Sequence, residues 1–179
     1  MKQIIALGDS IVRGIVLDKS QNNLKYRYTQ LDENFVAICS AQLGCVIKNF
    51  GMFGNTTLRA LHNLDRHKSA IESAEYVIME FGGNDCDHHW SEIADNPSAE
   101  HHPFISIPQY SEQLHELIAS VQSLGAKPIL LSLPPIIADK YFDTFTKDMS
   151  REQRDNVLLW LNGCLENITQ WHDMYNIAL

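Results

Sequence analysis

The chain has 179 residues, 45% of them hydrophobic, and its 14 basic and 22 acidic residues give a net charge of −8. This length allows one domain with a full core. The acidic net charge argues against nucleic acid and anionic membrane surfaces as partners, since both bind preferentially to basic protein surfaces. No apolar run is long enough for a signal peptide or a membrane span, and the four cysteines lack zinc-ligand spacing. We therefore expect a soluble, cytoplasmic protein with reduced cysteines.

The first element in chain order is a short strand that ends in a polar turn. Residues 4–7 form an apolar run, and Gly8-Asp9-Ser10 stops it abruptly. Such a short run is typical of a strand buried on both faces of a parallel sheet. Ligands bind at the carboxyl ends of these strands, so Ser10 is expected where the sheet performs its chemistry.

Strand and helix patterns then alternate along the chain, after a polar loop expected over residues 18–26. Further strands are predicted over residues 45–50, 75–81 and 127–133. Helices are predicted over residues 31–43, 55–64, 108–125 and from 150 onwards, the last with Gly163 as a point where it can break. This alternation indicates a single α/β domain over residues 1–179, with a parallel sheet.

The stretch over residues 82–106 is long for a connection in a compact domain. It contains His88, His89, His101 and His102, and a short helical turn is expected over residues 91–95. The favoured interpretation is a partly exposed lid that shapes substrate access. A zinc site built from the four histidines is an alternative, although their spacing is not a standard one.

Three of the predicted strands end in residues suited to acyl transfer. In a flavodoxin-like sheet of order 2-1-3-4, the first and third strands are neighbours, so Ser10 and Asn84 should face each other. Gly54, after the second strand, can offer an N–H group with no side chain in the way. An amide and backbone N–H groups can stabilise a developing oxyanion, so we expect Ser10 as nucleophile with Gly54 and Asn84 as donors.

With these residues in place, the chain resembles the SGNH (GDSL) hydrolases, a family of esterases and lipases. The resemblance rests on three segments: Gly8-Asp9-Ser10, residues 49–57, and Gly82-Gly83-Asn84-Asp85. It implies a flavodoxin-like three-layer α/β/α fold, the same roles for Ser10, Gly54 and Asn84, and neither cofactor nor metal. The G-x-S-x-G signature of α/β-hydrolases is absent.

One segment of the family pattern has no match here. The family carries its general base in an Asp-x-x-His segment near the C-terminus, whereas Trp171-His172-Asp173 has these residue types in the wrong order. The chain is therefore interpreted as a fragment or natural truncation that lacks a fifth strand and the base. A serine without a base is a poor nucleophile, so weak or undetectable activity is expected.

Four residues near the three segments are expected to contact the substrate: Asp9, Asp85, His88 and His89. The two histidines are also the best candidates to replace the absent base. Without a fifth strand, residues 129–133 would form an apolar sheet edge, which predicts a homodimer through that edge.

The sequence thus favours an ester hydrolase that cleaves small acyl or acetyl esters, such as those on carbohydrates, through an acyl-enzyme on Ser10. The alternative is a catalytically silent member of the same fold that binds a ligand or partner. Nucleotide binding is a weaker alternative, because no G-x-G-x-x-G segment follows the first strand.

Overall fold

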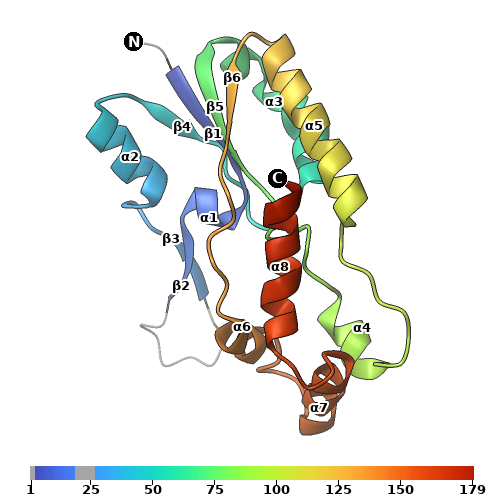
Figure 1. Ribbon diagram of the computed structural model, residues 1–179. Coiled ribbons are helices and arrows are strands. Elements are labelled where there is room, and N and C mark those ends of the chain that lie inside the picture. The colour runs from blue at the N-terminus through green and yellow to red at the C-terminus, as the bar shows by residue number, and fades with distance from the viewer. Residues whose placement is uncertain (1–2, 19–26) are drawn as a thin grey trace.

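A four-stranded parallel sheet organises the structure, a computed structural model that describes residues 3–18 and 27–179. Its strands are β1 (Gln3–Gly8), β4 (Ile47–Asn49), β5 (Ala74–Glu80) and β6 (Lys127–Leu130), in the order β4-β1-β5-β6 (Figure 1). This confirms the predicted order, in which the first strand lies between the second and the third. Gly8 pairs in register with Glu80, so the carboxyl ends of β1 and β5 lie side by side.

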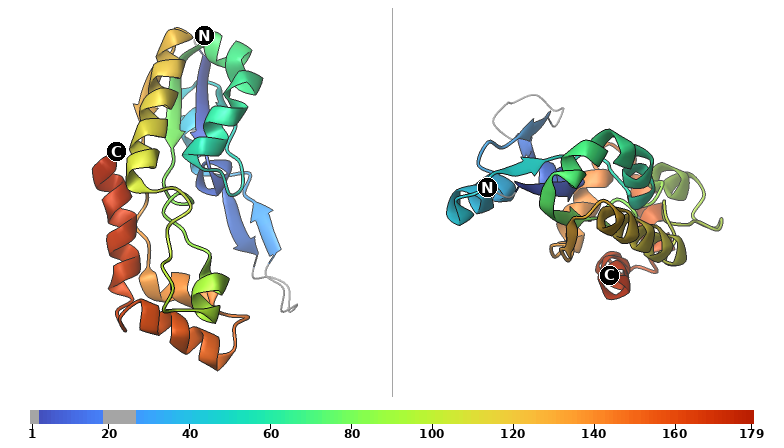
Figure 2. Two further views of the ribbon diagram at one scale, coloured as in Figure 1. Left: turned by 90° about the vertical axis from the view of Figure 1, so that its right-hand side faces the viewer. Right: turned by 90° about the horizontal axis from the view of Figure 1, so that it is seen from above.

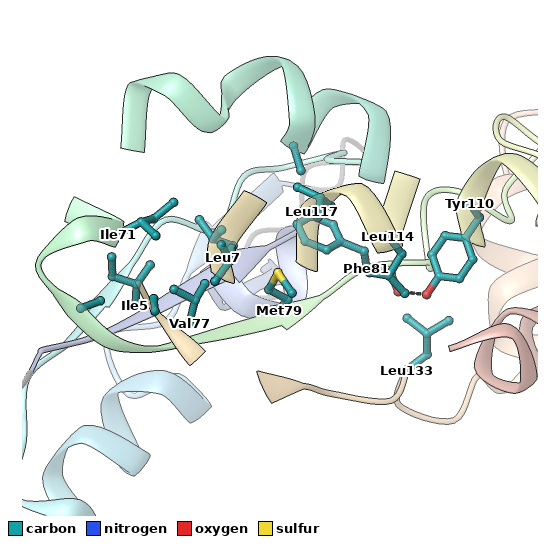
Figure 3. Packing of buried hydrophobic residues seen from close by; sticks show 14 of the residues in the cluster. Ile5, Leu7, Ile71, Val77, Met79, Phe81, Tyr110, Leu114, Leu117 and Leu133 are labelled. Carbon is teal, nitrogen blue, oxygen red and sulfur yellow. Dashed lines mark hydrogen bonds between the residues drawn. The ribbon is translucent and has the colours of Figure 1, made fainter. Parts of the chain in front are cut away.

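Helices cover both faces of this sheet, because successive side chains along a buried strand point to opposite faces. Ile5 and Leu7 pack under α3 (Thr57–Glu72) and α5 (Ile107–Ser123), together with apolar residues of β5 (Figure 3). Ala6 faces the other way, toward α1 (Ser10–Arg13) and α2 (Phe35–Leu43). The predicted three-layer α/β/α fold is therefore confirmed.

The helices on the two faces begin at the capping residues that the sequence offers. Asn34 opens α2 by accepting a hydrogen bond from the Ala37 N–H at 3.1 Å, and Gly44 ends it in the left-handed conformation with φ 60°. Thr56 opens α3 by accepting from the Arg59 N–H at 3.3 Å. The predicted helix over residues 31–43 is thus shorter than expected, because the Asn34 cap fixes its start.

A second group of helices packs beyond the carboxyl end of the sheet (Figure 1). It consists of α4 (Trp90–Asp95), α6 (Ala138–Phe145), α7 (Arg151–Trp160) and the first part of α8 (Glu166–Ala178), whose apolar side chains form their own cluster. The helical turn expected over residues 91–95 and the break at Gly163 are both confirmed. Helix α8 then runs back alongside α5 (Figure 2).

Three features were not predicted from the sequence. They are helix α1, helix α6 and a small antiparallel sheet formed by β2 (Ile15–Asp18) and β3 (Arg27–Gln30). Residues 19–26 of the loop expected here lie outside the described part of the chain. Among the helices within the described ranges, none has the length and apolar character needed to cross a membrane.

Strand β6 forms one edge of the described sheet, where it pairs with β5 alone. Ile129, in the middle of β6, is 40% exposed, so apolar surface is present at this edge as expected. The homodimer that this edge predicts stays a prediction.

Candidate active site

Ser10 is held at the carboxyl edge of the sheet by a short helix that starts directly after β1. The carboxylate of Asp9 caps this helix, since its Oδ1 accepts a hydrogen bond from the Ile11 N–H at 2.7 Å. The first N–H groups of a helix have no acceptor within the helix. Ser10, the first residue of this helix, therefore lies at the edge where β1 and β5 end, with its N–H unbonded within the helix.

The side-chain amide of Asn84 is tied to the same edge. Its Nδ2 donates one hydrogen bond to Asp9 Oδ2 at 2.9 Å and a second to the Asn55 carbonyl at 3.0 Å. Asn55 in turn donates its own side-chain amide to the Gly8 carbonyl at 3.1 Å. The ends of β1 and β5 and the loop after β4 are thus joined by hydrogen bonds, with Asn84 bound to the residue that precedes Ser10.

Gly54 lies next to Asn55 in the loop after β4. Its φ of 63° is in the left-handed region, where a side chain would be strained. The Gly54 carbonyl accepts a hydrogen bond from Arg59 Nη1 at 2.6 Å, whereas its N–H donates to none of the residues that the structure describes. The expected free N–H is therefore present, and its use by an oxyanion stays a prediction.

A second glycine allows the loop after β4 to approach the helix of Ser10. A Cβ atom at Gly51 would lie 2.5 Å from the Arg13 backbone nitrogen and 2.9 Å from the Asp9 carbonyl oxygen. No side chain fits there, so glycine is required for this close approach.

Three carboxyl groups are buried beneath this edge. Asp9 and Glu80 are each 2% exposed, and Asp85 is fully buried. Burial raises the pKa of all three, and the hydrogen bond from the Ile11 N–H partly offsets this effect at Asp9. For Glu80, burial and the nearby negative charge of Asp9 raise the pKa to about 8.

Asp85 does not reach the surface where a substrate would bind. Its Oδ1 accepts hydrogen bonds from both the N–H and the hydroxyl of Thr57, the first residue of α3. The expected substrate contact is therefore corrected: Asp85 holds α3 against the end of β5. Likewise, both Asp9 oxygens accept hydrogen bonds, from the Ile11 N–H and from Asn84 Nδ2, so Asp9 orients the site and does not face a substrate.

His88 lies inside an aromatic cluster and not in an exposed lid. Its ring centroid is 5.5, 5.2 and 5.0 Å from those of Trp90, Trp160 and Trp171, and burial lowers its pKa to about 4. His89 is exposed and packs edge-on against Phe104. Among the described residues, no histidine forms a hydrogen bond with Ser10, so neither histidine takes the place of a base in this conformation.

A cavity of about 340 Å³ adjoins this aromatic cluster. Its lining is mainly apolar and aromatic: Cys86, His88, His101, Pro103, Ser106, Ile107, Pro108, Trp160, Trp171, Met174 and Tyr175. Burial raises the pKa of the Cys86 thiol to about 12, so this thiol stays protonated and unreactive. His88 thus lines a cavity, whereas His89 is not part of the lining. The expected contact of either histidine with a substrate stays a prediction.

The zinc alternative finds no support in the geometry. Within residues 3–18 and 27–179, no three or more His, Cys, Asp or Glu side chains are grouped to hold a metal. His101 Nε2 instead lies 2.8 Å from the Asn96 carbonyl, and His102 pairs with Glu100 at 3.4 Å.

Two residues that position the site were missed from the sequence. Glu80 is one, and an acidic residue at the end of the apolar run Val77–Met79 was the available signal. Asp87 is the other: its Oδ1 accepts hydrogen bonds from the His88 N–H, Trp90 Nε1 and the Tyr141 hydroxyl. It thereby ties the stretch after Asn84 to α6, a contact that no local pattern reveals.

Comparison with known proteins places this geometry in a family. The GDSL-like lipase/acylhydrolase family matches residues 6–174. None of the curated proteins matches the chain.

Similar solved structures include Est24, a carbohydrate acetylesterase from Sinorhizobium meliloti, at 17% identity and a TM-score of 0.56, over 95% of this chain and 81% of that one. LAE5, an α/β hydrolase enzyme from the metagenome of Lake Arreo, has 20% identity and a TM-score of 0.53, over 94% and 74% of the two chains. A variant of Axe2, an acetyl-xylooligosaccharide esterase from Geobacillus stearmophilus, has 21% identity and a TM-score of 0.52, over 94% and 73%. At these identities the structural likeness shows a shared fold, and the match over residues 6–174 shows that the chain belongs to the GDSL-like lipase/acylhydrolase family.

Proposed function

We propose that the chain is a serine ester hydrolase that forms an acyl-enzyme on Ser10. The observation that carries this proposal is the hydrogen bond between the Asn84 amide and Asp9, the residue before Ser10. Together with the bond from Asn84 to the Asn55 carbonyl, it joins the segments that carry Ser10, Gly54 and Asn84, which supports a shared site at this edge of the sheet. Acyl transfer needs such a nucleophile together with donors aimed at the oxyanion.

In the proposed reaction, Ser10 Oγ forms a bond to the ester carbonyl carbon, and the carbonyl oxygen becomes an oxyanion. Asn84 Nδ2 and the Gly54 N–H donate to this oxyanion, joined by the Ser10 N–H. The Asn84 amide already donates hydrogen bonds to Asp9 and to the Asn55 carbonyl. One of these two bonds must break before the amide can donate to the oxyanion. We assign the Asn55 carbonyl as the contact released, since the bond to Asp9 keeps the amide oriented. A base from solution takes the proton of the Ser10 hydroxyl during this attack. The oxyanion then collapses, the bond between the carbonyl carbon and the alcohol oxygen breaks, and the alcohol leaves with that proton. Water adds to the acyl carbonyl in the same way and releases the acid and the Ser10 hydroxyl.

The proposed substrates are small acyl or acetyl esters. Two of the similar proteins act on acetylated carbohydrates, which supports an ester of this kind as substrate. The acidic net charge of −8 also suits an uncharged substrate better than an anionic one.

A base supplied from solution should reveal the reactivity of Ser10. We expect added imidazole to raise hydrolysis of phenyl acetate on the order of tenfold, a part of the roughly 10²–10⁴-fold contribution of a positioned base. Release of phenol measures the rate. Imidazole also reacts with the ester directly, so the Ser10→Ala variant is the control and should show only that direct reaction.

Equal imidazole-dependent rates in the unaltered protein and in Ser10→Ala would remove Ser10 from the reaction. That result would favour the alternative, a ligand-binding member of the family without turnover.

A further inference from the structure

Glu80 is a buried acid with no donor to stabilise it as an anion. It is the last residue of β5, and neither of its carboxyl oxygens receives a hydrogen bond from an N–H or O–H group in the described structure. An ionised carboxylate in such a place is costly, because burial removes its water without supplying a partner. The group is therefore expected to keep its proton.

Asp9, the neighbour of Glu80, has the opposite surroundings. One Asp9 oxygen accepts a hydrogen bond from the Ile11 N–H and the other accepts one from Asn84 Nδ2. These two bonds stabilise the ionised form of Asp9. The two carboxyl groups interact directly, and the negative charge of Asp9 acts on Glu80. The other titratable groups that face Glu80 are Asp85, directly beyond β5, and Tyr110, from α5.

We propose that Glu80 is a positioning residue for the candidate active site: as a neutral carboxylic acid it donates a hydrogen bond to Asp9 and so holds the carboxylate that orients the Asn84 amide. The inference rests on the proposed function for its catalytic meaning, but the hydrogen-bonded chain from Glu80 through Asp9 to Asn84 can be tested without turnover. Loss of the Glu80 proton would put a second charge beside Asp9 in a buried place, and repulsion would displace Asp9 from Asn84.

The sign of the pH effect follows from the raised pKa. The stability that protonated Glu80 contributes is fully present below its ordinary value of 4.5, and it is lost as pH rises through about 8. The titrations of Asp9 and Asp85 add to the pH dependence of every variant. The Glu80→Gln variant isolates the part due to Glu80, since it keeps a neutral donor of the same shape at every pH.

The direct test follows the side-chain amide signals of Asn84 by ¹H–¹⁵N NMR, identified by their loss in Asn84→Ala. In the unaltered protein these signals should shift with a midpoint near pH 8, the value to which burial and Asp9 raise the pKa of Glu80. In Glu80→Gln the transition should be absent. The Tm of the unaltered protein should also fall relative to that of Glu80→Gln by roughly 5–10 °C between pH 5 and pH 9.

Asn84 signals that shift identically in both proteins, or in neither, would overturn the proposal. The Glu80→Leu variant removes the donor and should displace the Asn84 signals at all pH values; if this variant does not fold, the comparison with Glu80→Gln still decides. A protein that passes the NMR test but hydrolyses no ester even with added imidazole would leave the role of Glu80 intact and count against the esterase.

Discussion

Replacing Asn84 by alanine is expected to lower the rate of Ser10 acylation by about 10²–10³-fold, the usual effect of removing one oxyanion donor. We expect a loss of rate of this size because the hydrogen bond from the Asn84 amide to Asp9 holds the amide beside the start of the helix that carries Ser10. Single-turnover release of 4-nitrophenol from 4-nitrophenyl acetate, with imidazole present, measures this rate.

A second asparagine provides a matched control for that experiment. Asn63 lies on α3, where its side-chain amide donates to the Arg59 carbonyl within the same helix. Asn63→Ala should change the acylation rate less than twofold, since such a change lies within about 0.5 kcal/mol. Acylation of Asn84→Ala as fast as that of the unaltered protein would show that the amide does not serve the oxyanion.

The largest expected effect on stability comes from Asp87→Ala. Asp87 Oδ1 accepts three hydrogen bonds, at 2.9 Å from the His88 N–H, 2.7 Å from Trp90 Nε1 and 2.6 Å from the Tyr141 hydroxyl. Alanine would leave these part-buried donors without an acceptor, so the free energy of unfolding should fall by about 2–4 kcal/mol. Unfolding in urea, followed by tryptophan fluorescence, measures it.

Tyr141→Phe separates the contribution of one donor from that of the whole set. It removes the hydroxyl but leaves Asp87 bound to His88 and Trp90, so a loss of about 0.5–1.5 kcal/mol is expected. Equal stability of Asp87→Ala and the unaltered protein would contradict the view that this carboxylate joins the stretch after Asn84 to α6.

The arrangement of the sheet could be predicted because it depends on local patterns. Short apolar runs such as the one with Ile5 and Leu7 mark strands buried on both faces, and polar turns mark their carboxyl ends. The usual order of such strands brings β1 beside β5. Because β1 and β5 are adjacent, the residues that follow them, Ser10 and Asn84, lie at the same edge of the sheet. The hydrogen bond from Asn84 to Asp9 is consistent with this.

The surroundings of single side chains could not be predicted in this way. His88 was expected in a partly exposed lid because residues 82–106 form a long connection, but Trp160 and Trp171, far along the chain, pack against it. Asp85 was expected to contact substrate because it follows Asn84, but α3 uses its carboxylate. Both outcomes depend on packing between distant elements, which periodicity does not encode.

The same limit explains why the positioning residues were missed. Glu80 and Asp87 act through partners that lie on other elements, Asp9 after β1 and Tyr141 on α6. An acidic residue directly after a buried apolar run is unusual, but only the structure shows which group Glu80 faces.

The central claim is that Ser10 is the nucleophile, and covalent labelling tests it most directly. The protein should be treated with a fluorophosphonate, which phosphorylates a reactive serine with loss of fluoride, and the adduct located by peptide mass mapping. The account predicts one adduct, on the peptide that contains Ser10, and none in Ser10→Ala. An adduct on another serine, or equal labelling of Ser10→Ala, would contradict it.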